Sequence, residues 1–421
     1  MLLSEAKHRA WLAPLVIGVA ALAAGVVPAR AADPIKVGFS AELTGSLAGY
    51  GKQTLLTEQI WAEDVNNAGG LLGRKVELVY YDDQSNPALV PSIYEKLLDV
   101  DHVDLLLAQG TNISSPAMPT IIEHKKVVMV MLALAINEKF HYQRFFQTMP
   151  YGPDGKDALT RGFFEAAMSM NPKPKTVAIV GADAEFSKGA LDGARRNIKR
   201  LGLETVYDRT YPPNTVDYTP IVRAISATEP DVIMVASYPA DTAGFLRAAA
   251  EVGLKARIFG GPMVGLQSGA IKMQLGPALN GIVCYELFVH EPTMHFPGTD
   301  EFIKKYQARA GEAGVDPLGF YVPPFTYATM QVLQSAVAAV GSLDQDKLAD
   351  YIHKTTFNTI VGDIKFGPDG EWAKPRILTI QYQNIQGHGM AQFTEPGHQV
   401  ILYPPELQSG KLEYPYSDIK H

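Results

Sequence analysis

Short apolar runs alternate with longer segments of helical periodicity along the first part of the chain. The apolar runs predict strands at residues 35–39, 76–81, 103–108 and 127–131. The segments between them predict helices at residues 53–66, 89–100 and 115–124. Because strands that alternate with helices form a parallel sheet with helices on both faces, this part predicts an α/β unit.

The alternation stops at residues 145–154, which are rich in turn-forming residues, and then begins again. Further strands are predicted at residues 176–180, 204–211, 232–236 and 258–259. Further helices are predicted at residues 187–201, 219–228 and 241–252. The chain has 421 residues, and a single hydrophobic core rarely grows beyond about 250–300 residues. We therefore expect an α/β fold of two lobes, each a doubly wound parallel sheet.

The last part of the chain predicts a different arrangement. Helices are predicted at residues 300–311, 324–340 and 344–354. Residues 363–383 predict a hairpin around the turn Gly367-Pro368-Asp369-Gly370. The tail, residues 395–421, contains several prolines and is predicted to lie extended over the surface.

The first residues carry the features of an export signal. A basic start is followed by an apolar run over residues 11–27 and by Ala29-Arg30-Ala31, a small-x-small cleavage pattern. The run is nearly long enough to be a membrane helix, but Pro14, Pro28 and the cleavage pattern favour a signal. We expect residues 1–31 to be removed and the mature chain to be a soluble periplasmic protein.

Charge and cysteine content exclude several classes of protein. The formal net charge is −7 and no basic stripe is present, so nucleic acid is not an expected partner. Cys284 is the single cysteine, so no disulfide can form within the chain. Its apolar neighbours predict a buried thiol in a strand.

Motifs for nucleotide and metal chemistry are incomplete. The loop at residues 46–53 resembles a phosphate-binding loop, but Ser46 replaces its first glycine and Gln53 replaces the metal-binding hydroxyl residue. His290 and His295 are five residues apart, and Pro292 lies between them, which does not suit a zinc site on one helical face. We expect no enzyme activity, no metal and no cofactor.

Small and hydroxyl-bearing residues gather where strands are predicted to end. The loop 41–51 places Tyr50 before a helix, and the loop 109–116 opens the next one with free backbone amides. Ligands of open α/β sheets bind at these strand ends, and a helix N-terminus favours an anion. A ligand carboxylate fits the second loop. Helix capping by Ser114 or Ser115 is the alternative interpretation.

The stretches IKVGFSAELTGSLAGYG and NNAGGLLGRKVELVYYDDQSNP resemble the Leu/Ile/Val-type periplasmic binding proteins of ABC importers, and the resemblance covers residues 33–385. It implies the type I periplasmic binding fold, in which two lobes joined by a three-strand hinge close on a small ligand. It also implies a monomer that delivers ligand to a permease and ATPase complex; the alternative is a periplasmic ligand sensor. The implied crossovers lie near residues 149–152, 282–285 and 361–364. The implied lobes are residues 32–150 with 284–362, and residues 151–283 with 363–421.

The same resemblance implies the ligand-binding residues, which are Tyr50, Gly110, Thr111, Ala133, Ala135, Phe186, Tyr238, Met263 and Tyr321. Ala135 stands where amino-acid binders usually have threonine, and Met263 stands where they have the acid that pairs with the ligand ammonium. Because a buried ammonium without a counter-charge costs several kcal/mol, we expect an aromatic or branched organic acid as the ligand. The alternative is a hydrophobic amino acid whose ammonium pairs with Glu185 or Asp183.

Overall fold

The computed structural model describes Met1 and residues 33–420 of the chain. The predicted export signal therefore lies, apart from Met1, outside the described residues. Within residues 33–420, no helix combines the length and the apolar composition that crossing a membrane requires.

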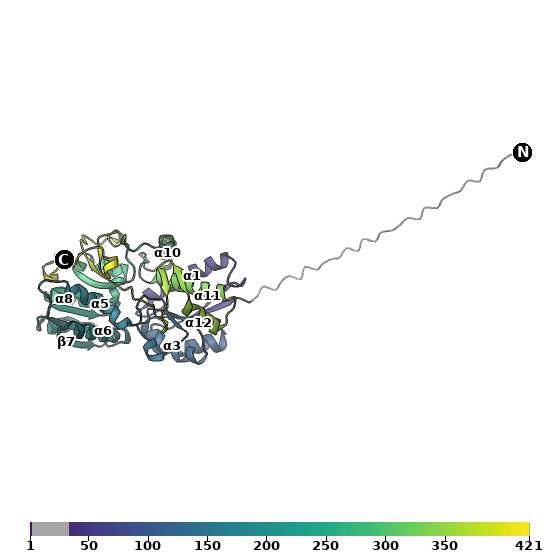
Figure 1. Ribbon diagram of the computed structural model, residues 1–421. Helices are drawn as coiled ribbons and strands as arrows, with labels where there is room; N and C mark the ends of the chain where they lie inside the picture. Colours follow the sequence, from purple (N-terminus) through teal and green to yellow (C-terminus); the bar gives the residue numbers. More distant parts are fainter. Residues whose placement is uncertain (2–32, 421) are drawn as a thin grey trace. The chain divides into compact units, whose positions relative to one another are not determined.

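The first lobe, which lies at the right of the ribbon in Figure 1, is built on a five-stranded sheet. Every neighbouring pair of its strands is parallel. Its strands, in the spatial order β2-β1-β3-β4-β5, are β1 (Ile35–Ala41), β2 (Val76–Asp82), β3 (Leu105–Gln109), β4 (Val128–Met131) and β5 (Phe145–Gln147). Its first helices are α1 (Ala48–Asn67), α2 (Val90–Glu95), α3 (Thr111–Glu123) and α4 (Asn137–Phe140). Every residue of β3 and β4 is buried, as expected for strands covered on both faces.

Three later helices pack against the first lobe. They are α10 (Thr299–Ala313), α11 (Val322–Val340) and α12 (Gln345–Lys354), and a small hairpin of β11 (Thr356–Thr359) and β12 (Gly362–Lys365) follows them. Helix α11 lies beside α1, where the Trp61 indole N–H donates to Gln334 Oε1 at 3.0 Å. Arg309 of α10 forms a two-pronged ion pair with Glu63 of α1. The chain therefore returns to its first lobe after building the second.

The second lobe contains a seven-stranded sheet in the order β14-β13-β10-β9-β8-β6-β7. Its strands are β6 (Thr176–Ala182), β7 (Glu204–Tyr211), β8 (Val232–Ala236), β9 (Ile258–Gly261), β10 (Ile282–Glu286), β13 (Leu378–Tyr382) and β14 (Gln399–Tyr403). Its helices are α5 (Gly155–Met168), α6 (Glu185–Leu201), α7 (Thr219–Ser226), α8 (Pro239–Val252) and α9 (Gly269–Leu275). Strands β6 to β10 are parallel, whereas β13 and β14 are antiparallel additions at one edge.

Short helical turns complete the described secondary structure. They are one π-helical turn, η2 (Lys96–Val100), and the 3₁₀ turns η1 (Pro87–Leu89), η3 (Val264–Gln267), η4 (Gly276–Leu279), η5 (Met390–Phe393), η6 (Pro405–Leu407) and η7 (Tyr416–Asp418).

The predicted α/β fold with two sheets is confirmed, and its differences from the observed fold lie mainly in the connections. Helix α5 was not predicted. Helix α3 begins at Thr111, earlier than the predicted residue 115, although it contains Pro116 and Pro119. Proline is disfavoured in helix interiors because it lacks a backbone N–H donor. The helix predicted from the sequence was therefore shorter than the observed one.

The predicted hairpin-like region at residues 363–383 is only partly right, because a short hairpin forms around its turn, with an antiparallel bridge between Phe366 and Trp372. The turn at Gly367–Gly370 does form, since Gly367 N donates to Glu371 O at 2.7 Å. However, the strand before it, β12, pairs with β11, while the strand after it, β13, pairs with β10 and β14. Beyond the short pairing next to the turn, the two arms thus belong to different sheets.

The predicted extended tail is only partly right. Residues 399–403 form the edge strand β14, in which Val400 and Ile401 are buried. Strand β14 pairs with β13 and covers the edge of that strand, which would otherwise be exposed.

The positions of the lobe boundaries remain a proposal. Cys284 and Tyr285 pair with β9 or β13 in the second sheet, so we propose a crossover after Glu286. Gln147 N donates to Gly370 O, and the Trp372 indole N–H donates to Thr148 O, so we propose that the last crossover follows Trp372.

Close contact between α5 and α6 gives a stability test. A Cβ placed on Gly193 would lie 1.9 Å from Lys156 O, whereas a Cβ on Gly311 of α10 would meet nothing within 4 Å. We expect Gly311→Ala to stabilise the protein by about 0.5–1 kcal/mol, and Gly193→Ala to destabilise it by about 1–3 kcal/mol because the helices must separate. Thermal unfolding measures both. Equal stability of the two variants would contradict the close helix contact.

Candidate functional site

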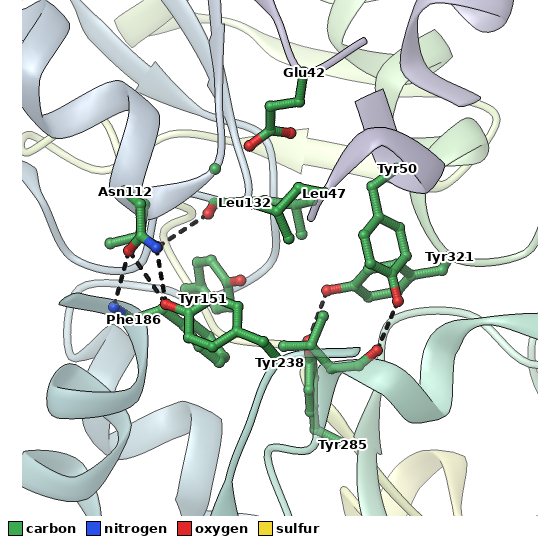
Figure 2. A pocket seen from close by; sticks show the side chains of 13 residues that line it. Glu42, Leu47, Tyr50, Asn112, Leu132, Tyr151, Phe186, Tyr238, Tyr285 and Tyr321 are labelled. Carbon is green, nitrogen blue, oxygen red and sulfur yellow. Dashed lines mark hydrogen bonds between the residues drawn. The ribbon is translucent and has the colours of Figure 1, made fainter. Parts of the chain in front are cut away.

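A cavity lies between the carboxyl ends of the first-lobe strands and the loops of the second lobe (Figure 2). Its empty space, including the opening to solvent, is about 520 Å³. The residues that line it come from both lobes and from the first crossover: Glu42, Leu47, Tyr50, Gly110, Thr111, Asn112, Leu132, Tyr151, Phe186, Tyr238, Val264, Tyr285 and Tyr321.

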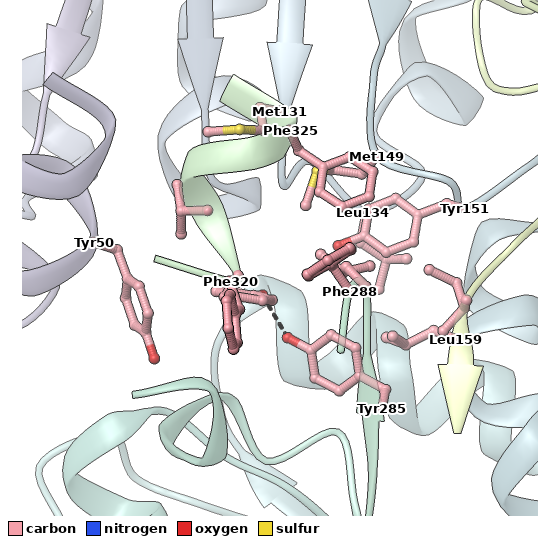
Figure 3. Packing of buried hydrophobic residues seen from close by; sticks show 14 of the residues in the cluster. Tyr50, Met131, Leu134, Met149, Tyr151, Leu159, Tyr285, Phe288, Phe320 and Phe325 are labelled. Carbon is pink, nitrogen blue, oxygen red and sulfur yellow. Dashed lines mark hydrogen bonds between the residues drawn. The ribbon is translucent and has the colours of Figure 1, made fainter. Parts of the chain in front are cut away.

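Aromatic rings form much of the cavity wall. Tyr321 makes edge-on contacts with Tyr50 and with Tyr285, at ring-centroid distances of 5.7 and 6.2 Å. Phe186 and Tyr238 make a similar contact at 6.0 Å. Buried hydrophobic residues including Phe288, Phe325 and Met149 pack in the same cluster (Figure 3). Because these rings hold one another in place, the wall suits a flat or branched apolar group.

The N-terminus of α3 contributes backbone donors to the cavity. Gly110 precedes the helix with φ of 73°, a conformation that favours glycine. The Thr111 hydroxyl donates to Leu132 O at 3.1 Å and accepts from Leu134 N at 3.0 Å, so it fixes the neighbouring loop. The first amides of α3 have no acceptor within the helix. A negative group of a ligand can therefore be bound at this point.

A buried carboxyl group also faces the cavity. Glu42, directly after β1, is 3% exposed, and its Oε1 has no hydrogen-bond partner among the described residues. Its Oε2 accepts a hydrogen bond from Gln109 Nε2 at 3.2 Å. Burial raises the pKa of Glu42 well above its ordinary value, the charge of Asp83 raises it further, and the Gln109 hydrogen bond lowers it by less. Since no lysine, arginine or histidine is among the residues lining the cavity, the neutral form of Glu42 is favoured.

Hydrogen bonds connect the two lobes across the cavity. The Tyr50 hydroxyl of α1 donates to Val264 O at 2.7 Å. The Asn112 amide of α3 exchanges two hydrogen bonds with the Tyr238 hydroxyl, at 3.0 and 3.2 Å, and also accepts from Phe186 N (Figure 2). Tyr285 and Tyr321 share a hydrogen bond of 2.6 Å between their hydroxyls. These contacts define a closed arrangement of the lobes.

Six of the nine sequence-predicted binding residues line the cavity, namely Tyr50, Gly110, Thr111, Phe186, Tyr238 and Tyr321. Ala133, Ala135 and Met263 do not. Ala133 is fully buried, and Ala135 lines a separate hollow together with Asp183 and Glu185. Asp183 and Glu185, the expected alternative counter-charges, are thus also outside the cavity.

Met263 is fully buried, and its neighbour Val264 lines the cavity instead. Met263 forms a parallel bridge with Ser237 in extended conformation. Its side chain belongs to the main hydrophobic cluster, so Met263 points into the core. Because Met263 does not line the cavity, the lack of an acid at position 263 does not decide whether the cavity contains an acid.

Sequence reasoning missed Glu42 and Asn112, although both lie in the two loops that it selected. It also missed Tyr151, which lies in the predicted first crossover, and Tyr285, which lies in a strand that the pattern marked as buried. The signal for Glu42 was that it is the single charged residue in the loop 41–51.

Within residues 33–420, no group of three or more His, Cys, Asp or Glu side chains is arranged so that it could hold a metal ion.

Comparisons with known proteins agree with this architecture. A model of the periplasmic binding protein family matches residues 34–379. The leucine-, isoleucine-, valine-, threonine-, and alanine-binding protein of Pseudomonas aeruginosa is 24% identical over 81% of this chain and 88% of its own length.

Solved structures show the same fold. An isoleucine complex of a branched-chain amino acid transporter substrate-binding protein from Streptococcus pneumoniae superposes with a TM-score of 0.69 at 20% identity, covering 84% of this chain and 97% of the other. A benzoate complex of an ABC transporter solute-binding protein from R. palustris gives a TM-score of 0.70 at 18% identity, covering 88% and 95%. With a family match over most of its length, this chain belongs to the periplasmic binding protein family, of the branched-chain amino acid type and with the type I fold.

Proposed function

We propose that this protein is the solute-binding component of an ABC importer, which acts in the periplasm as a monomer after loss of residues 1–31. It binds a small ligand between its lobes and presents the closed form to a permease driven by an ATPase. The family match and the descriptions of several relatives as transporter components support this assignment.

The proposed ligand is a small carboxylate with an aromatic or branched apolar body. The observation that carries this choice is a cavity with aromatic walls and α3 amides, in which no cationic side chain is present and the one carboxyl group favours its neutral form. An apolar body would pack on the rings of Tyr50, Tyr321 and Phe186, and its carboxylate would lie at the N-terminus of α3. The benzoate complex of the R. palustris protein supports the capacity of this fold for such a ligand.

A hydrophobic amino acid is the second candidate, and Glu42 is the observation that favours it. The carboxyl of Glu42 could lose its proton and pair with a ligand ammonium close to α3. The amino-acid specificity of the P. aeruginosa relative supports this alternative. Loss of the proton in a buried site beside Asp83 opposes it.

Closure of the lobes is the proposed mechanism. The ligand docks on the first lobe at α3, and the bonds from Tyr50 to Val264 and from Asn112 to Tyr238 then hold the second lobe in place. A ligand shifts this equilibrium only by its greater affinity for the closed form. Phe186 and Tyr238 belong to the second lobe, so they contact the ligand only in the closed form. These contacts supply the difference in affinity.

Matched ligand pairs test the proposed class. 4-Methylpentanoate and 3-phenylpropanoate are leucine and phenylalanine without the amino group, so each pair isolates the effect of the ammonium. We expect the acids to bind at least about tenfold more tightly, which corresponds to about 1.4 kcal/mol. Thermal shift and isothermal titration of the mature protein measure this, with benzoate as a further acid. Tighter binding of both amino acids would reverse the choice of ligand.

The contact between Tyr50 and Val264 gives a test of closure. Tyr50→Phe removes the donor but keeps the ring, so we expect the affinity for the best ligand to fall about fivefold, as for the loss of about 1 kcal/mol. Tyr207→Phe is the control, because Tyr207 lies on the edge strand β7 and not in the cavity. Titration that finds equal affinities for both variants would contradict the role of this bond.

A further inference from the structure

Glu42 is a buried acid that the fold of the lobe does not use in an ion pair. It is 3% exposed, it lines the cavity, and its Oε1 has no partner among the described residues. The buried pair of Lys272 and Glu286 shows the contrasting case, in which nitrogen and oxygen are 3.0 Å apart. An acid that is buried without a cation is either neutral or awaits a charge from outside.

The groups around Glu42 favour the neutral form. Asp82 ends β2 and Asp83 follows it: Asp82 Oδ1 accepts from Leu43 N at 3.0 Å, and Asp83 Oδ2 accepts from the Ser40 hydroxyl at 2.5 Å. From β3 only the neutral Gln109 reaches the carboxyl. From α1 the nearest titratable residue lining the cavity is Tyr50, whose pKa burial raises well above its ordinary value. No positive group faces Glu42 from these elements.

The hydrogen bond from Gln109 also decides which oxygen carries the proton. Oε2 accepts the amide N–H of Gln109, so it is the carbonyl-like oxygen of a neutral acid. The O–H group is then Oε1, the unpartnered oxygen of a side chain that lines the cavity. A Cβ placed on Gly110 would lie 3.3 Å from Oε1, so this oxygen lies against the residue that precedes α3.

We propose that Glu42 stays protonated in the complex and that its Oε1–H donates a hydrogen bond to the ligand carboxylate, next to the amides of α3. The proposal rests on the proposed function and deepens it, because Glu42 then becomes the residue that selects an organic acid over the matching amino acid. A ligand ammonium near Oε1 would meet the hydrogen of the acid, and binding would first require Glu42 to lose its proton. A hydrogen bond between a neutral acid and a carboxylate is short and strong.

The arrangement predicts a direction for pH dependence. Binding requires the protonated form, so affinity is constant while free Glu42 is protonated and falls up to tenfold for each pH unit above its pKa, which burial and Asp83 raise. Acid binding takes up protons on that alkaline side. An amino acid held by ionised Glu42 would instead release a proton at lower pH.

Isothermal titration of the mature protein from pH 5.5 to 9, in buffers of different ionisation enthalpy, tests the proposal with benzoate and with 4-methylpentanoate and leucine. We expect Glu42→Gln to bind the acids within about threefold of the wild type at pH 6 and to lose the alkaline decline, because the amide keeps an N–H donor in the place of Oε1–H. Glu58→Gln is the matched control, since Glu58 is also 3% exposed on the same lobe but does not line this cavity. It should keep the decline, and thermal unfolding checks that both variants are folded.

The outcomes separate this proposal from the broader function. Proton release on tight leucine binding, with loss of leucine binding in Glu42→Gln, would overturn the role of Glu42 as donor while leaving a solute-binding protein. An alkaline decline that persists in folded Glu42→Gln would also overturn it. Failure of the wild type to bind any of these ligands at any pH would count against the proposed ligand classes themselves.

Discussion

Polar groups that are buried at the carboxyl edge of the first sheet control the properties of this site. The first α3 amides have no acceptor within their helix, and the buried Oε1 of Glu42 has no partner among the described residues. Buried donors and acceptors without partners cost free energy. A ligand that satisfies them recovers this cost, so the same groups that weaken the empty lobe provide affinity for the correct solute.

Thr111 and Tyr238 at this edge are hydrogen-bonded, whereas Glu42 Oε1, Gln109 Oε1 and Ser114 Oγ have no partner among the described residues, and this contrast makes the site specific. The hydroxyl of Thr111 joins Leu132 to Leu134, and the hydroxyl of Tyr238 exchanges two bonds with Asn112. These side chains hold the loops and cannot change partners without breaking a bond. The few unsatisfied groups therefore lie at fixed positions, which is the preorganisation that tight binding of a small molecule needs.

The aromatic residues connect this chemistry with closure. Tyr50 and Tyr321 belong to elements of the first lobe, whereas Tyr285 belongs to the second sheet, and their rings and hydroxyls contact one another across the cavity. An apolar ligand body adds to this cluster only when the lobes are together. Recognition of the apolar part and formation of the closed state are thus one event, while recognition of the charged end takes place on the first lobe.

The two-sheet α/β fold could be predicted from the sequence, because hydrophobic periodicity depends on local backbone geometry. The family could be predicted from the resemblance of its sequence stretches to known binding proteins. The two loops of the site could be predicted as well, since parallel strands bring their carboxyl ends to one edge. The position of Met263 could not, because its direction follows from an extended pairing with Ser237 that no local pattern reveals. The hairpin at residues 363–383 was only partly right for the same reason: its turn and the pairing beside it are local, but β13 pairs with β10, which is distant in sequence.

By itself, the sequence determined the elements, their order and the loops that carry polar residues. Only the tertiary structure decided which side chains share the cavity. Strand β1 lies between β2 and β3, so the loop after β1 meets the loop after β3, and Glu42 comes to lie beside Gly110 and Gln109. Charge balance in a buried site depends on such neighbours from distant parts of the chain, and it exists only once the chain has folded.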